Sequence, residues 1–331
     1  METAQETPDA GVTACNLRPS WQALLQQRTL VMRHLRQRLE RPAGKYAALG
    51  AALVLMVCLL LSAQGQYGGR RSGRFGRGYD YGNAERIREQ EMMQKALDPA
   101  FKEDVFTFAR LKFDSPDYGG YGRGRIWDDD TPDADLNVIY RLFEATSLKV
   151  RPGLNFIDIT TKDLADYPFV YMAGAGQVNL SEEQAAALRG YLLNGGFLMV
   201  DDFWGDEQWD HFAGQARLIF PTRAPEEINL TNQIFHMVYS FKKQPQIPSV
   251  GDFYYSHRSY DQRHIYARMN HDPHYFGIYD DKRRLMMLIC HNNHYGDGWE
   301  HEGDDETYFD LFSMPMGYPM LINILAYAMS H

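Results

Sequence analysis

The sequence predicts an α/β domain with a doubly wound, mostly parallel sheet, preceded by a membrane-targeting segment. Short apolar strands alternate with amphipathic helices along the body of the chain. The segment Phe197–Val200 is apolar on both faces, as expected of a parallel strand that helices cover from both sides. A long apolar run behind basic residues predicts the targeting segment.

Charge is distributed unevenly along the 331 residues. Residues 1–82 contain 11 Lys and Arg against 5 Asp and Glu, whereas the rest of the chain contains 23 against 38. A basic head on an acidic body is typical of membrane targeting. The acidic body would repel a phosphate backbone, so we expect no nucleic-acid partner.

The N-terminal pattern divides the chain into four segments. We predict a basic cytoplasmic head at 1–45, a signal-peptide h-region or membrane anchor at 46–65, a flexible Gly/Arg/Tyr linker with a lead-in helix at 66–103, and the α/β domain at 104–331. Cleavage after Ala63-Gln64-Gly65 stays open. Unless it is cleaved, residues 46–65 make the membrane a partner, together with membrane-associated proteins. The positive-inside rule predicts an exported or membrane-anchored protein whose folded domain lies outside the cytoplasm.

The first part of the body predicts a strand and a helix. Val105–Phe113 is rich in β-forming residues and alternates, which indicates a first strand. Thr131 and Pro132 are expected to be the N-cap and the first residue of a helix. The buried face of this helix is predicted from the spacing of Leu136, Ile139, Tyr140 and Phe143.

A parallel crossover is predicted in the middle of the body. Strands are expected at Asn155–Ile159 and Phe169–Ala173, and the capping box Ser181–Gln184 opens a helix that ends at Gly195-Gly196. Phe197–Val200 then returns as a strand.

The end of the chain predicts a hairpin and a helix. The hairpin pairs Tyr275–Tyr279 with Leu285–Cys290, and Pro315–Met329 is expected to be a packed core helix rather than a second membrane span.

Two polar segments directly follow apolar strands. Doubly wound sheets bind ligands at the carboxyl ends of their strands, so we expect both segments to line one ligand groove. In the alternative interpretation, one aspartate caps the next helix and the other is solvated. The candidate binding residues are Asp201, Asp202, Trp204, Asn292, Asn293, Asp297, Trp299 and Glu300.

Other motifs favour plain structural roles. Gly174-Ala175-Gly176 lacks the third glycine of a dinucleotide fingerprint, so a tight turn is favoured and no cofactor is predicted. The spacing of His291 and His294 is common by chance and fixes no carboxylate partner, so we predict no metal. Cys290 ends an apolar strand, where a buried inert thiol is expected.

Residues 105–331 contain, in this order, the segments FTFARLKF, TPDADLNVIYRLFEATSL, DYPFVYMAGAG, LSEEQAAALRGYLLNGGFLMVDDFWG, YFGIYDDKRRLMMLICHN, GDGWEHEG and NILAYAMSH. This ordered run of segments resembles the domain of unknown function 4159 family. It implies a flavodoxin-like, class I glutamine-amidotransferase-like fold. Such amidotransferases use a cysteine at a strand–helix elbow with a His and a Glu. No cysteine here occupies an elbow, so glutaminase activity is not implied. The resemblance also implies an acidic residue after Asn293, where this chain has His294, which argues further against a metal.

These observations predict an envelope-facing ligand-binding or assembly module on an amidotransferase-like scaffold without the catalytic cysteine. The alternative is a hydrolase of a sugar or another polar substrate, with Asp201 or Asp202 as general base. A third hypothesis is a structural partner of a membrane complex that uses the Tyr-rich residues 251–279. Whether the protein is an enzyme stays open.

The charge pattern makes one testable prediction about topology. A reporter fused after Tyr81 that folds only outside the cytoplasm should be active, because six basic residues precede the apolar run. Activity of a matched reporter that works only in the cytoplasm would contradict the prediction.

Overall fold

The computed structural model describes residues 81–97, 99, 104–114, 126–257 and 272–331. The predicted head at 1–45, the apolar segment at 46–65 and nearly all of the predicted linker before Tyr81 lie outside these residues. The chain divides into two compact units, and the described residues from Gly82 onward belong to one of them.

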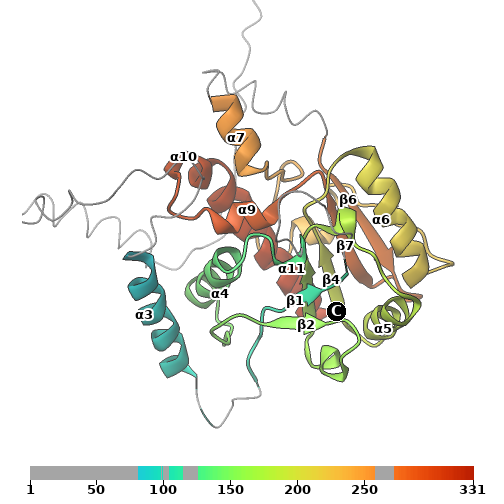
Figure 1. The fold of residues 1–331 in the computed structure, drawn as a ribbon, viewed down its shortest axis with the longest axis horizontal. Coiled ribbons are helices and arrows are strands. Elements are labelled where there is room, and N and C mark those ends of the chain that lie inside the picture. The colour runs from blue at the N-terminus through green and yellow to red at the C-terminus, as the bar shows by residue number, and fades with distance from the viewer. Residues whose placement is uncertain (1–80, 98, 100–103, 115–125, 258–271) are drawn as a thin grey trace, which may run out of the picture. The chain divides into compact units, whose positions relative to one another are not determined.

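A seven-stranded mixed sheet forms the centre of this unit, in the order β2-β1-β3-β4-β7-β6-β5 (Figure 1). The five strands from β2 to β7 in this order are parallel, and β6 and β5 add an antiparallel edge. The strands are β1 (Arg110–Lys112), β2 (Phe156–Asp158), β3 (Phe169–Met172), β4 (Phe197–Val200), β5 (Glu226–Glu227), β6 (His274–Tyr279) and β7 (Leu285–His291).

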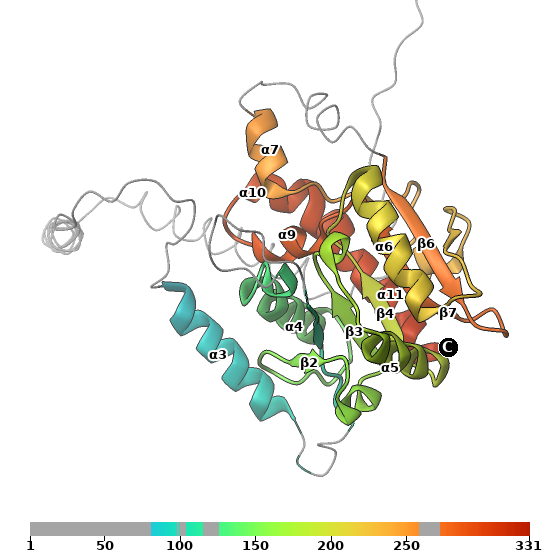
Figure 2. The same cartoon turned by 45° about the vertical axis from the view of Figure 1, so that its right-hand side comes forward.

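Helices cover both faces of the sheet (Figure 2). Successive side chains of a strand point to opposite faces. Phe169 and Tyr171 accordingly belong to one core with α4 and α11, while Val170 and Met172 belong to another with α5 and α6. The longer helices are α3 (Tyr81–Ala96), α4 (Asp133–Ala145), α5 (Glu182–Leu193), α6 (Gly205–Ile219), α7 (Val250–His257) and α11 (Tyr318–Ser330). The short ones are α9 (Tyr295–Glu300), α10 (Glu306–Tyr308), η2 (Ile126–Asp128), η3 (Lys162–Asp166), η4 (Ala175–Gln177), η5 (Gln233–Phe235) and the π-helical η6 (Phe309–Gly317).

The central crossover and the late hairpin are confirmed. Ser181 Oγ accepts a hydrogen bond from Gln184 N at 3.1 Å, and Gln184 Oε1 accepts one from Ser181 N at 2.9 Å, which completes the capping box. β4 has the predicted bounds, and β6 and β7 form the predicted antiparallel pair. These elements depend on local patterns, which the sequence states directly.

The first strand and the start of α4 differ from the prediction. Only Arg110–Lys112 of the expected Val105–Phe113 is a strand, because the edge strand β2 offers three residues to pair with it. Phe106 forms an isolated bridge to Val150. α4 begins at Asp133, one residue after Pro132, and the Thr131 hydroxyl donates to the carbonyl of Asp128 instead of capping the helix.

The buried face of α4 was predicted only in part: Ile139 belongs to the core, and Tyr140 and Phe143 pack against it. Leu136, Tyr140 and Phe143 are only partly buried, and the face that packs on the sheet is rotated from them. It consists of Ala134, Asp135, Val138, Ile139 and Leu142. The rotation follows from Asp135, which is 1% exposed because it pairs with a buried arginine.

That arginine, Arg110, is fully buried at the start of β1. Its guanidinium donates to the Asp135 carboxylate at 2.5, 3.1 and 3.3 Å. It also donates to the carbonyls of Trp127 at 3.2 Å and Asp129 at 2.7 Å. One side chain therefore fixes both α4 and the loop that precedes it.

The C-terminal helix packs as a core element, as expected. Within the part of the chain that the structure describes, Glu306–Ser330 is the one helix long and apolar enough to cross a membrane. In its most apolar 18-residue stretch, 61% is buried inside the protein. Leu321, Ile324 and Leu325 of α11 belong to the core under the sheet.

We predict that Arg110→Met lowers the free energy of unfolding by about 3–5 kcal/mol, because it leaves the Asp135 carboxylate buried without its partner. Arg110→Met/Asp135→Leu should recover part of this loss, since both charges are then removed. Urea unfolding of the full-length chain measures both values. A double variant no more stable than Arg110→Met would contradict this account.

Candidate functional site

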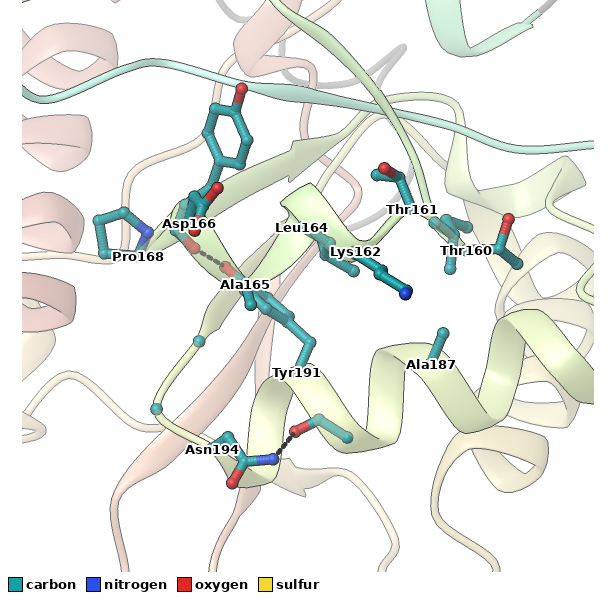
Figure 3. A pocket seen from close by; sticks show the side chains of 15 residues that line it. Thr160, Thr161, Lys162, Leu164, Ala165, Asp166, Pro168, Ala187, Tyr191 and Asn194 are labelled. Atoms are coloured by element: carbon teal, nitrogen blue, oxygen red, sulfur yellow. Dashed lines mark hydrogen bonds between the residues drawn. The ribbon is translucent and has the colours of Figure 1, made fainter.

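A groove of about 600 Å³ lies at the amino ends of β3 and β4 (Figure 3). Tyr167 and Pro168 precede β3 and Gly195-Gly196 precedes β4, which places the groove on the sheet edge opposite the predicted ligand groove. Lys162 and Asp166 are its charged lining residues, and it includes none of the predicted site residues. The polar residues predicted to bind a ligand therefore lie elsewhere.

The two predicted acidic segments meet at the carboxyl ends of β4 and β7. These strands are parallel neighbours, with Val200 paired to Ile289, so their carboxyl ends lie on one edge. An isolated bridge between Phe203 and Asn293 continues the contact beyond the strands. Both segments therefore lie at one edge of the sheet, as expected, and the ligand groove along this edge stays a prediction.

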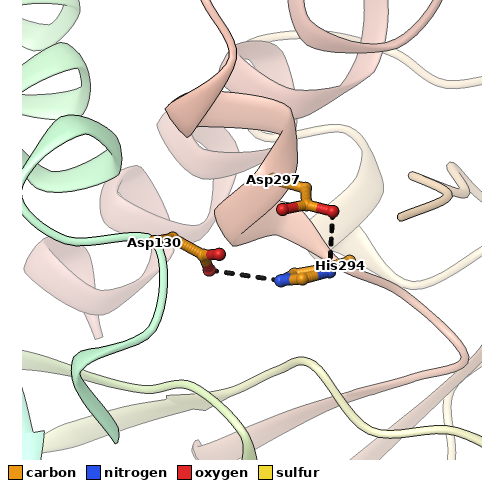
Figure 4. A group of neighbouring side chains, drawn as sticks. All are labelled: Asp130, His294 and Asp297. Carbon is orange, nitrogen blue, oxygen red and sulfur yellow. Dashed lines mark hydrogen bonds and ion pairs between the residues drawn. The ribbon is translucent and has the colours of Figure 1, made fainter. Parts of the chain in front are cut away.

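His294 is the centre of this edge. Its Nδ1 lies 3.1 Å from Asp297 Oδ2 and 3.6 Å from Asp202 Oδ1, and its Nε2 lies 3.2 Å from Asp130 Oδ2. Figure 4 shows the imidazole between Asp130 and Asp297. The side chains of the histidine and of these two aspartates are each less than 10% exposed. Three carboxylates thus share one ring in a nearly closed environment.

Asp130 reaches the ring from the loop before α4. Arg110 holds this loop through the Asp129 carbonyl, and the Asp130 carbonyl accepts from Ala134 N at 3.0 Å. The Asp130 carboxylate lies against Gly296 in the first turn of α9, where a Cβ atom would be 1.9 Å from Oδ2. Only glycine leaves room for this carboxylate beside the histidine.

Asp201 joins the end of β4 to the start of α9. Its Oδ2 accepts hydrogen bonds from Tyr171 OH at 2.8 Å, Tyr295 N at 2.7 Å and Gly296 N at 3.2 Å. Its Oδ1 is buried and has no hydrogen-bond partner among the described residues. The aspartate therefore caps a helix, but that helix is α9 rather than α6, the next one along the chain.

Burial and charge act in opposite directions within this cluster. Burial raises the pKa of Asp201 to about 7 and that of Asp202 to about 6, although His294 opposes both shifts. Burial disfavours a charged His294, but Asp202, Asp297 and Asp130 outweigh it and hold the pKa of the imidazole well above its usual range. Burial also disfavours the charged form of Asp297, yet His294 lowers the pKa of that carboxyl. The surrounding carboxylates therefore favour the charged form of the ring.

Comparison with protein families gives one match. The model of the family described as domain of unknown function (DUF4159) matches residues 107–329. The chain belongs to this DUF4159 family. No curated protein matches the chain.

In this DUF4159 domain, Asp297 also contacts residues outside the His294 cluster. Its Oδ2 accepts from Val250 N at 2.7 Å, and its Oδ1 lies 3.7 Å from His301 Nε2. His301 Nε2 lies 3.1 Å from the half-buried Glu300 carboxylate. Asp297 therefore belongs both to the closed cluster and to a more exposed group with Glu300 and His301.

Two predicted binding residues of the DUF4159 domain hold its backbone instead. Asn292, at φ 57°, accepts from Gly205 N at 2.9 Å and donates to the Asp272 carbonyl at 2.8 Å. Asn293 is fully buried, and its Oδ1 accepts from Ile247 N at 3.0 Å. Both side-chain amides form hydrogen bonds within the fold, and both residues are buried.

The two tryptophans have different environments. Trp299 is 1% exposed and packs with Tyr171 at 5.3 Å and Tyr295 at 5.8 Å between ring centroids, so protein aromatics cover the ring of this predicted binding residue. Trp204 is partly buried, and its side chain interacts with the Asp202 carboxylate. Trp204 thus stays a candidate, whereas Trp299 is a core residue.

The cysteine and the glycine turn also fit their expected structural roles. Cys290 is fully buried within β7, and burial raises the pKa of its thiol well above the usual range. Gly174 has φ 65° and opens the 3₁₀ turn η4, and a Cβ at Gly176 would meet Gln208. This is a tight turn with close packing.

Sequence reasoning missed Asp130 and His294 as members of the cluster. Asp130 lies 164 residues from His294, and no periodic pattern connects them. His294 was set aside because no carboxylate was fixed beside it. The available signal was two pairs of neighbouring aspartates. Asp129-Asp130 precede the predicted first helix of the body, and Asp201-Asp202 follow the apolar strand Phe197–Val200.

The buried carboxyls predict how stability depends on pH. A folded pKa of about 7 for Asp201, against 3.8 for the free side chain, means that the folded state keeps a proton that the unfolded state has lost. The free energy of unfolding in EDTA should therefore fall as pH rises from about 4 to about 7. Asp201→Asn should flatten this slope, as measured by urea unfolding. The exposed Asp206→Asn is the control, and equal slopes in both variants would contradict the assignment.

Proposed function

We propose that this domain is an envelope-facing ligand-binding module whose ligand carries positive charge. The observation that supports the proposal is the excess of acidic side chains. Asp130, Asp202 and Asp297 lie within 3.6 Å of the one ring of His294, and Asp201 is buried at the same edge. Buried charges are costly unless they are paired. A positive ligand would compensate the carboxylates that His294 leaves unbalanced.

Asp202 is the group that we expect to meet the ligand first. Its side chain is 14% exposed, more than those of His294, Asp130 and Asp297. Its φ is 57°, and Asp130 and Asn292 nearby are also left-handed. Backbone held in this region clusters at functional sites. Three of the four left-handed non-glycine residues in the described chain thus lie at this edge.

We further infer a flavodoxin-like, amidotransferase-like scaffold that lacks the catalytic cysteine. The parallel strand order β2-β1-β3-β4-β7 supports this inference. Asp202 lies at the elbow between β4 and α6, the kind of position where amidotransferases of this fold place a cysteine. The Cys290 thiol lies inside β7 instead. A binding role needs no nucleophile at the elbow.

The envelope-facing part of the proposal depends on residues 1–65. Its support is the basic head before an apolar run in the sequence. The reporter fusion after Tyr81 tests it separately from ligand binding.

The second candidate function is a hydrolase in which Asp202 is the general base. The observation that favours it is the raised pKa of Asp202, about 6, because a base works best when its pKa is close to the working pH. Asp201 is less suited, since its Oδ2 already accepts three hydrogen bonds and its side chain is buried. Turnover of p-nitrophenyl glycosides that is lost in Asp202→Asn would favour this candidate.

We predict that Asp202→Asn weakens ligand binding by at least about tenfold while the free energy of unfolding changes by less than about 1 kcal/mol. Asparagine tolerates the left-handed backbone and removes one repelling charge. Calorimetric titration of the full-length chain with spermidine and, separately, with MnCl₂ measures the binding of an organic and an inorganic cation.

The matched control is Asp206→Asn in the exposed first turn of α6. It should leave binding unchanged. If neither probe binds, or if Asp206→Asn weakens binding as much as Asp202→Asn does, the proposed function is wrong.

A further inference from the structure

We propose that the positive ligand is one divalent transition-metal ion, held by Asp130, His294 and Asp297. This inference rests on the proposed function and names the chemical class of its ligand. It replaces the sequence-based prediction of no metal, because the structure places a carboxylate at each ring nitrogen of His294.

The three side chains already have the spacing of a metal site. Each offers one ligand atom, and these atoms all lie within 4.8 Å of one another. Two atoms bound to one ion at about 2.1 Å each are at most about 4.2 Å apart. Asp130 faces Nε2, whereas Asp297 and Asp202 face Nδ1. An ion at Nε2 would lie beside Asp130 and leave Nδ1 facing Asp202, and Asp297 would turn toward the ion. The ring nitrogen that does not bind the ion keeps a carboxylate partner, as metal-binding histidines usually do.

The donor types favour a particular class of metal. Mg²⁺ and Ca²⁺ prefer sites made only of oxygen atoms. A set of two carboxylates and one imidazole suits Mn²⁺, Fe²⁺ and Zn²⁺ better. Among these, nitrogen and oxygen sites generally bind Zn²⁺ more tightly than Mn²⁺.

A second observation beside the cluster is the unpartnered oxygen of Asp201. Asp201 is 0% exposed, and its Oδ1 has no hydrogen-bond partner within the described residues. Its Oδ2 accepts a hydrogen bond from Gly296 N. Asp130 Oδ2 lies against the same glycine, next to where a Cβ atom would be. An unsatisfied buried carboxylate oxygen costs free energy. A cation bound by Asp130 would place positive charge near the Asp201 carboxylate, because Asp201 Oδ2 and Asp130 Oδ2 both lie against Gly296.

The surrounding structure is built to keep these ligands in place. Arg110 fixes the Asp129 carbonyl next to Asp130, and Gly296 admits the Asp130 carboxylate. Val250 N donates to Asp297, and Ile247 O accepts from His294 N. Each ligand is therefore held by a contact outside the cluster, as preorganised metal sites require.

The test is calorimetric titration of the EDTA-treated, dialysed full-length chain with ZnCl₂, MnCl₂, MgCl₂ and CaCl₂. We expect Zn²⁺ and Mn²⁺ to bind with a stoichiometry of one and Mg²⁺ and Ca²⁺ to bind at least about tenfold more weakly. Asp130→Asn and Asp297→Asn should each weaken Mn²⁺ binding by about 100-fold or more, and Asp206→Asn should not. Far-UV circular dichroism in EDTA checks that each variant is folded.

A spectroscopic readout identifies the histidine directly. Pulsed electron paramagnetic resonance of bound Mn²⁺ should show coupling to one imidazole nitrogen, which His294→Gln should remove. The inference is overturned if Zn²⁺ and Mn²⁺ do not bind, if folded Asp130→Asn and Asp297→Asn proteins bind them normally, or if the nitrogen coupling is absent. Asp202-dependent binding of spermidine without metal binding would overturn this inference and leave the proposed function standing.

Discussion

The burial of one histidine among three carboxylates is the constraint on which the carboxyl edge of this sheet depends. His294 cannot occupy its position unless Asp130, Asp202 and Asp297 approach it from three different segments. Asp201 makes that approach possible because its carboxylate ties β3, through Tyr171, to the first turn of α9. Because β4 and β7 are parallel neighbours, the segments that follow these two strands lie close together.

A second buried charge supports the same edge from a distance. The pairing of Arg110 with Asp135 turns α4 so that its acidic residue faces the sheet, and the same guanidinium holds the carbonyls of Trp127 and Asp129. Asp130 follows directly in the chain. The position of Asp130 thus depends on the Arg110–Asp135 ion pair, which does not itself contact His294.

The elements that sequence patterns predicted well are those that local physics decides. The capping box at Ser181, the apolar strand β4 and the β6–β7 hairpin are each specified within a few residues. The buried face of α4 was predicted only in part because hydrophobic spacing gives no weight to an aspartate that is buried by a distant arginine. The same limit hid Asp130, whose partner is 164 residues away.

The candidate site shows a related limit for polar residues that follow strands. Such residues are found both at binding sites and in turns that need side-chain hydrogen bonds. Asn292 and Asn293 serve the turn after β7, and Trp299 fills the core, whereas Asp202 and Asp297 contact His294. The same residue types occur at binding sites and in turns, and only the contacts that each side chain makes in the structure distinguish the two roles.

Crystals of the full-length chain grown with MnCl₂ would show where a metal binds, through an anomalous difference map recorded near the manganese edge. We expect one peak within bonding distance of Asp130, His294 and Asp297. A map in which these three side chains stand apart, or in which manganese lies elsewhere and leaves His294 without a metal, would contradict it.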